Sequence, residues 1–149
     1  MATGGARLFA RPLVAEERDG LAAALARVGL PAEDIHDPGA RFWRFERDDV
    51  PIGFGGLEIH GEDALLRSIL TVPPMRHRGY GHAIVESLEI EARSHGCRAL
   101  YLLTTSAASF FQELGYVACE RNNIPPAIRD CRMFALYCPS SAAVMVKRL

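Results

Sequence analysis

Residues 76–83 read "RHRGYGHA", and they follow the apolar run "ALLRSILTVPP" at 64–74. This short stretch has two glycines, two arginines and no acidic residue. Glycine lets the backbone come close to a ligand, and the first N–H groups of a helix attract an anion. The stretch therefore predicts an anion-binding turn between a strand and a helix.

A helical period begins within this stretch and continues to residue 94. The apolar side chains of the segment recur at helical spacing on one face, while charged residues occupy the others. That apolar face consists of Ile84, Val85, Leu88 and Ala92. Because glycine is common just after the last turn of a helix, Gly96 marks its end. We therefore expect a helix over 79–94.

Three runs before the turn have the pattern of consecutive strands joined by short turns. They read "RFWRFER" (41–47), "IGFGGLEIH" (52–60) and "ALLRSILTV" (64–72), which predicts an antiparallel meander. After the expected helix, "RALYLLTT" (98–105) is typical of a buried strand. The next run, "SAASFFQELGY" (106–116), predicts a helix that stops at its glycine.

The two ends of the sequence complete the expected sheet. The N-terminal part predicts a strand at 6–12, which Pro12 ends, and then a helix at 16–28. The C-terminal part predicts a strand at 116–119, a helix near 126–136 and a final strand at 142–148. The order predicts the α/β (α+β) class, a mixed sheet with helices packed on it, in one domain over 1–149.

Composition narrows the functional class. The chain has 149 residues, 49% of them hydrophobic, and a formal net charge of −1. A net charge so close to zero creates no overall electrostatic field that would attract nucleic acid or an anionic membrane. The apolar runs are too short to cross a bilayer. The start of the sequence lacks the apolar core of a secretory signal, so we expect a cytoplasmic protein.

The four cysteines form no C-x-x-C pair, and no resident metal is expected. They are Cys97, Cys119, Cys131 and Cys138. In a reducing compartment, such cysteines are typically small buried hydrophobic residues. The alternative is a soft-metal or arsenite site formed by Cys131, Cys138 and a distant partner.

The glycine turn resembles motif A of the GNAT superfamily of acetyl-CoA-dependent acetyltransferases. The pattern of that motif, [Q/R]-x-x-G-x-[G/A], is matched by Arg76, Gly79 and Gly81. Pro73 precedes it by three residues, and "LYLLTT…FFQELGY" farther on is similar to another signature of the superfamily. The resemblance covers roughly residues 6–119. It implies a mixed, mostly antiparallel sheet of six to seven strands with helices on both faces.

The resemblance also implies how acetyl-CoA binds. The turn and its arginines would hold the pyrophosphate, and strand 64–72 would pair with the pantetheine arm where it splays from strand 98–105. Thr104 stands where many relatives have an asparagine that contacts pantetheine. The expected cofactor-binding residues are Leu70, Thr71, Val72, Arg76, His77, Arg78, Gly79, Tyr80, Gly81, His82, Thr104 and Phe111. Alternatively, the turn is an ordinary strand–helix connection, with His77 and His82 as solvated loop residues.

Three longer segments resemble arsenic-resistance-associated GNAT acetyltransferases and, more distantly, amino-acid acetyltransferases of the N-acetylglutamate synthase type. They are "LLRSILTV", "LYLLTTSAASFFQELGY" and "PPAIRDCRMFALYCPSSAAVMVKRL". This likeness implies a small acceptor with an amino group and a carboxylate, which guanidinium groups bind well. The expected acceptor-binding residues are Arg67, Ser68, Arg129 and Arg132. The alternative is that the arginines lie on the surface.

The sequence departs from the superfamily at the residues that move protons. Many relatives have a glutamate on strand 64–72 and a tyrosine on helix 106–116, but here the strand has no acid and Phe111 replaces the tyrosine. We therefore predict Glu58 as the base and Tyr116 as the acid. The alternatives are an ion pair between Glu58 and Arg67, and a buried aromatic role for Tyr116.

Three other side chains are secondary candidates. By period-two counting, His60 shares the face of Glu58 with Ile52 and Phe54, but it precedes the turn "GED" and is expected to be exposed. Ser68 and Ser109 are candidates for donating a hydrogen bond near the thioester sulfur, and each also suits an ordinary strand or helix position.

These features together predict an acetyl-CoA-dependent N-acetyltransferase that acts on a small amine or amino acid by direct attack in a ternary complex. The expected partner is a small molecule rather than nucleic acid or membrane, and the analogy with GNAT sheets that pair across subunits suggests a homodimer. Three alternatives remain: a catalytically silent acyl-CoA-binding or sensory domain, acetylation of a protein terminus or lysine, and arsenite binding.

Overall fold

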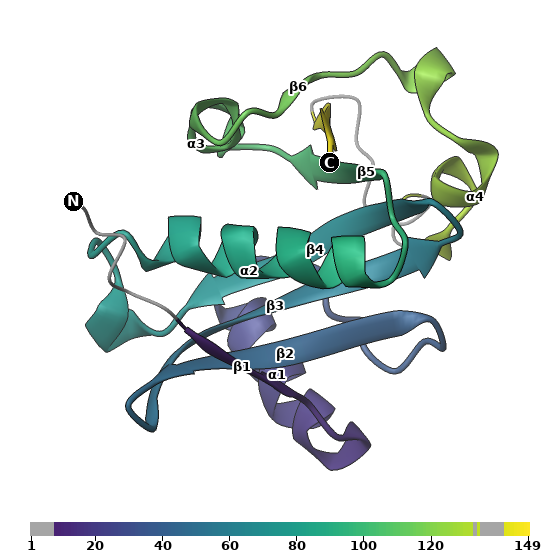
Figure 1. The fold of residues 1–149 in the computed structure, drawn as a ribbon. Helices are drawn as coiled ribbons and strands as arrows, with labels where there is room; N and C mark the ends of the chain where they lie inside the picture. Colours follow the sequence, from purple (N-terminus) through teal and green to yellow (C-terminus); the bar gives the residue numbers. More distant parts are fainter. Residues whose placement is uncertain (1–7, 133, 135–141) are drawn as a thin grey trace.

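A computed structural model describes residues 8–132, 134 and 142–149 (Figure 1). Its strands are β1 (Phe9–Pro12), β2 (Ala40–Arg47), β3 (Val50–His60), β4 (Asp63–Thr71), β5 (Ala99–Thr104), β6 (Val117–Ala118) and β7 (Ala143–Arg148). Its α-helices are α1 (Arg18–Arg27), α2 (Tyr80–Ser94), α3 (Ala108–Glu113) and α4 (Pro126–Arg129). Single 3-10 turns lie at Ala15–Glu17, Pro73–Met75 and Arg121–Asn123.

The strands form one seven-stranded sheet in the order β1-β2-β3-β4-β5-β7-β6. Its neighbouring strands pair antiparallel, apart from β4 and β5, which pair parallel. Helix α2 makes the crossover between those two strands, because parallel neighbours cannot be joined by a tight turn. The predicted mixed, mostly antiparallel sheet of six to seven strands is confirmed.

Helices cover both faces of the sheet, as predicted. Adjacent residues of a strand point to opposite faces, so Phe42 packs with α1 while Trp43 packs with α2. Figure 1 shows α2 crossing one face of the central strands, with α1 on the other. The side of the sheet that carries α1 and α4 is called the α1 face below, and the side that carries α2 and α3 is called the α2 face.

The C-terminal segment differs from its prediction. A helix was expected near 126–136; α4 ends at Arg129 and the chain turns at Asp130 and Cys131, while residues 132 and 134 are helical again. This turn directs Cys131 back toward the sheet, where it packs in the same buried cluster as Leu65 and Tyr101. Cys138 lies outside the described residues.

Candidate active site

Strands β4 and β5 separate partway along their length. Their parallel pairing begins at Asp63–Ala99 and ends at Leu65–Tyr101, although β4 continues to Thr71 and β5 to Thr104. Beyond Leu65, the pairing found for β4 in the described part of the chain is with β3 alone. The splay implied by the family resemblance is therefore present, and it leaves one edge of β4 open over 66–71.

A bulge lies within this open part of β4. Ser68 has a left-handed backbone with φ of +59°, and the two residues Ser68 and Ile69 stand opposite a single residue of β3, Gly55. A bulge of this kind interrupts the alternation of side chains. As a result, Arg67 and Leu70 both lie on the α1 face, next to Phe42.

The predicted anion-binding turn follows β4 directly. Gly79 is the residue before the first turn of α2, and its φ of +80° is one that L-amino acids with side chains rarely adopt. The first turn of α2 contains no acidic residue, so its N–H groups and the helix dipole offer a positive end. Arg76 donates from Nε to the carbonyl of Thr71 at 3.3 Å, and His77 and Arg78 are exposed beside it.

The next residues of the turn contact α3 and the end of β2. A Cβ placed on Gly81 would lie 3.1 Å from the ring of Phe110, so glycine allows the two helices to approach. The ring of His82 packs edge-on to the same phenylalanine, with the centroids 5.1 Å apart. Tyr80 accepts a hydrogen bond from Arg47 at 3.2 Å. The glycine at 81 thus has a packing role beside its predicted cofactor role.

Two predicted cofactor-binding residues lie beyond the splay, near α3. The Oγ1 atom of Thr104 accepts a hydrogen bond from the N–H of Ala107 at 2.9 Å, in the turn that precedes that helix. Phe111 is 8% exposed and packs edge-on against Tyr116. The phenylalanine therefore belongs mainly to the core.

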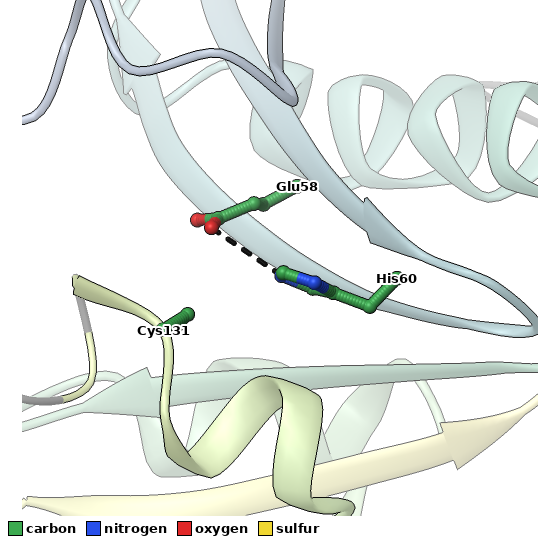
Figure 2. A group of neighbouring side chains, drawn as sticks. All are labelled: Glu58, His60 and Cys131. Atoms are coloured by element: carbon green, nitrogen blue, oxygen red, sulfur yellow. Dashed lines mark ion pairs between the residues drawn. The ribbon is translucent and has the colours of Figure 1, made fainter.

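Glu58 and His60 lie on β3, side by side on the α1 face (Figure 2). Glu58 pairs across the sheet with Leu65, the residue at which β4 leaves β5, so its carboxylate stands beside the start of the splay. Oε1 of Glu58 is 3.3 Å from Nε2 of His60. The histidine side chain is 22% exposed, so the expectation of an exposed His60 was wrong.

Arg67 is held inside the protein rather than open to a ligand. Its two terminal nitrogens donate to the two carboxylate oxygens of Asp34, one of them at 2.7 Å, and both side chains are almost completely buried. Its Nε donates to Oγ of Ser68 at 3.2 Å. Its Nη1 lies 3.8 Å from Oε2 of Glu58. The expected ion pair with Glu58 is thus secondary, and the carboxylate expected from an acceptor is supplied by Asp34.

Sequence reasoning missed Asp34, which lies in the short segment "LPAEDI" at 30–35. A charged arginine is almost never buried without a partner. An arginine in the middle of the apolar strand "ALLRSILTV" was therefore a signal that some acid had to fold over it, although its position in the sequence could not be inferred.

The two tail arginines are on the surface. Arg129 lies 3.5 Å from Asp130, and Arg132 binds Asp37 at 2.8 Å. They flank Cys131 in the sequence, and this cysteine reaches the pair formed by Glu58 and His60 (Figure 2). The structure thus brings the tail segment to the neighbourhood of the predicted base.

Tyr116 is not brought to this group. It is 1% exposed, packs on the α2 face and donates a hydrogen bond from its hydroxyl group to Oε2 of Glu89 at 3.0 Å. Burial, followed by the charge of Glu89, raises the pKa of Tyr116 above its ordinary value, so its proton is strongly held. The two predicted catalytic residues therefore lie on opposite faces of the sheet, and Tyr116 has a structural contact.

None of the described helices combines the length and apolar character needed to cross a membrane. A shallow surface hollow is lined by residues 118–122 and 142–144, beside β6 and β7, and it contains none of the predicted site residues.

The sequence matches the acetyltransferase (GNAT) family over residues 9–116. It is 32% identical over 126 residues to an amino-acid acetyltransferase of Azotobacter vinelandii, a match that covers 83% of this chain and 27% of that protein. The chain thus spans about a quarter of the length of this relative.

Solved structures with the same fold include proteins that bind coenzyme A. N-acetylglutamate synthase of Neisseria gonorrhoeae, complexed with coenzyme A and L-arginine, has a TM-score of 0.77 at 20% identity, over 97% of this chain and 34% of that one. A Mycobacterium tuberculosis protein in complex with CoA has a TM-score of 0.72 at 20% identity, over 95% and 99% of the two chains. At these identities, the likeness concerns the fold.

Proposed function

This chain belongs to the GNAT family of acetyltransferases, and we propose that it transfers the acetyl group of acetyl-CoA to the amino group of a small amino acid or amino-acid analogue. The acceptor amine attacks the thioester carbonyl directly while both substrates are bound. The new C–N bond forms, the C–S bond breaks, the amine loses a proton and coenzyme A leaves as the thiolate.

The observation that carries the proposal is the open edge of β4 next to the turn before α2. The edge over 66–71 offers unpaired backbone to the amide groups of an extended pantetheine arm. At its far end, the start of α2 and Arg76 suit a pyrophosphate. One bound molecule of coenzyme A would use both features, with its thioester near the bulge at Ser68.

In this proposal, Glu58 removes the proton of the attacking amine. Its carboxylate stands beside the point where β4 leaves β5, with Arg67 3.8 Å away on one side. Ser68, which accepts a hydrogen bond from Arg67, would lie near the thioester sulfur. A thiolate is a fair leaving group because thiols have a pKa of about 8.5, so a strong general acid is not needed.

The acceptor class rests on the tail arginines and on the relatives. Arg129 and Arg132 are exposed on the segment that reaches Glu58 through Cys131, and a guanidinium binds a carboxylate with two parallel hydrogen bonds. Amino-acid acetyltransferases are among the similar proteins. The sequence resemblance to arsenic-resistance enzymes adds amino-acid analogues that contain arsenic or phosphorus to the proposed acceptors.

A mass-spectrometric acceptor screen tests the proposal. The protein is incubated with acetyl-CoA and with amino acids, arsenic- and phosphorus-containing analogues, polyamines and peptides. We expect a gain of one acetyl group on an amino acid or analogue, and its loss when acetyl-CoA is replaced by coenzyme A. Binding of acetyl-CoA without turnover of any amine would instead indicate a silent acyl-CoA-binding domain. Acetylation of peptides alone would overturn the proposed acceptor class.

Replacement of Gly79 by valine tests the cofactor turn separately. A left-handed backbone costs an L-residue roughly 1–2 kcal/mol, and a β-branched side chain costs more. The turn would relax this strain by moving its N–H groups away from the pyrophosphate, so we expect coenzyme A to bind at least about tenfold more weakly. Isothermal titration calorimetry gives the affinity.

The matched control is Gly29→Val, because Gly29 also has a left-handed backbone, φ +75°, with no atoms within 4 Å of an added Cβ. This residue follows α1 and is not part of the proposed cofactor turn. Equal affinities for coenzyme A in the Gly79→Val variant and the parent protein would contradict the assignment of this turn.

A further inference from the structure

Three side chains of different chemistry meet on the α1 face at the end of β3. They are the carboxylate of Glu58, the imidazole of His60 and the thiol of Cys131, and one ligand atom from each lies within 4.8 Å of the other two. Figure 2 shows Glu58 and His60 projecting from the strand toward Cys131, which comes from the turn after α4. Residues 58 and 131 are far apart in sequence, so the fold itself creates this group.

The donor set of this group is that of zinc. Thiolate, imidazole and carboxylate together select a borderline-soft divalent ion over magnesium or calcium, which prefer oxygen alone. Bonds of about 2.0–2.3 Å to a tetrahedral ion place its ligand atoms roughly 3.3–3.8 Å apart. Glu58 and His60 already meet this separation at 3.3 Å, whereas Cys131, within 4.8 Å of both, has to approach by at most about 1–1.5 Å.

The histidine supplies a second, independent observation. Its Nε2 atom is buried and makes no hydrogen bond within the described part of the protein, although Oε1 of Glu58 is 3.3 Å away. A buried polar atom without a hydrogen-bond partner is costly. Coordination to a metal ion would remove that cost, because the neutral nitrogen has a lone pair to donate.

The charge around the group also suits a divalent cation. Arg67 lies 3.8 Å from Oε2 of Glu58, but Asp34 binds both of its terminal nitrogens and compensates its charge. Glu58 is therefore left with a negative charge, and a thiolate at Cys131 would add a second. One divalent ion balances both, and it would be bound through Oε1, the oxygen that faces His60.

We propose that Glu58, His60 and Cys131 form a binding site for one zinc-type divalent ion, with the fourth tetrahedral position open. Metal binding at this site does not require acetyl transfer, because the three ligands can hold an ion whether or not the protein is an active enzyme. The shared residue is Glu58. A bound ion would occupy the proposed base, so Zn²⁺ is expected to inhibit an active enzyme.

Titration of the metal-free protein with Co²⁺ tests the site directly. Cobalt is a spectroscopic substitute for zinc, and a cobalt–thiolate bond gives near-ultraviolet charge-transfer absorption. We expect saturation at one equivalent, with that absorption present and then lost when Zn²⁺ displaces Co²⁺. Zn²⁺ is also expected to raise the melting temperature, because it binds the folded state.

Variants identify the ligands. Cys131→Ser should abolish the charge-transfer absorption, and His60→Gln should weaken Co²⁺ binding at least about tenfold. Cys119→Ser is the matched control, a half-buried cysteine that lies outside the group, and it should bind as the parent does. Circular dichroism checks that each variant is folded.

The result that overturns the proposal is either no saturable Co²⁺ binding or an unchanged cobalt spectrum in Cys131→Ser. If Cys131→Ser does not fold, His60→Gln decides, since unchanged affinity in that variant also overturns it. Failure of acetyl transfer leaves this outcome unaffected, because the readout is the metal spectrum.

Discussion

Replacement of Glu58 by glutamine is expected to lower the rate of acetyl transfer at pH 7 by roughly 10²- to 10⁴-fold, the usual contribution of a general base. An alkyl amine with a pKa of about 10.4 is almost entirely protonated at pH 7 and cannot attack. Glutamine has a similar shape but cannot accept the proton. The measurement is kcat and KM for the acceptor from the screen, in the presence of a chelator.

The pH profile separates a base from a merely structural residue. Without the carboxylate, turnover depends on amine that is already neutral in solution, so the activity of Glu58→Gln should climb toward that of the parent protein as the pH rises. Glu62→Gln is the matched control, because Glu62 is exposed in the adjoining turn and pairs with Arg98 at 2.8 Å. A constant deficit of Glu58→Gln at all pH values would count against the base.

Replacement of Asp34 by alanine is expected to lower the free energy of unfolding by about 3–5 kcal/mol. The variant leaves the guanidinium of Arg67 buried, since its side chain is 0% exposed, and without its main counter-charge. Among the residues that the structure describes, Glu58 at 3.8 Å is the other acid paired with it and is too distant for a good hydrogen bond. Urea unfolding followed by circular dichroism gives the free energy.

Two comparisons make this prediction specific. Asp37→Ala removes a similar ion pair, but its partner Arg132 is half exposed, so the expected loss is roughly 0–1 kcal/mol. The double variant Asp34→Ala/Arg67→Met also removes the buried positive charge. Its free energy of unfolding should therefore be higher than that of Asp34→Ala alone. If Asp34→Ala and Asp37→Ala are equally stable, the buried pair does not have the importance assigned to it.

The sequence predicted the sheet and its helices well because their signals are local. Strand alternation, the period of α2 and the glycine turn before it depend on neighbouring residues, and the family motif adds the order of the strands. The bulge at Ser68 escaped prediction, because a serine in a left-handed backbone has no sequence signature. It moves Leu70 to the face of Arg67, where simple counting would place Ile69.

The candidate site was less predictable because it depends on contacts between distant segments. The partner of Arg67 comes from residue 34, and Cys131 reaches residues 58 and 60 through a turn that replaces part of an expected helix. Tyr116 was predicted as the acid, with a buried aromatic role as the alternative, and the fold buries it on the opposite face of the sheet. Burial and face are decided by packing, which a single sequence does not display.

The position of β7 between β5 and β6 has a consequence for folding on the ribosome. Synthesis proceeds from the N-terminus, so β7 is made after both of its neighbours. Until residues 143–148 leave the exit tunnel, the edges of β5 and β6 that they will occupy have no partner. A nascent chain at this stage exposes unpaired strands and the apolar residues behind them, which is the condition in which chaperones bind and aggregation begins.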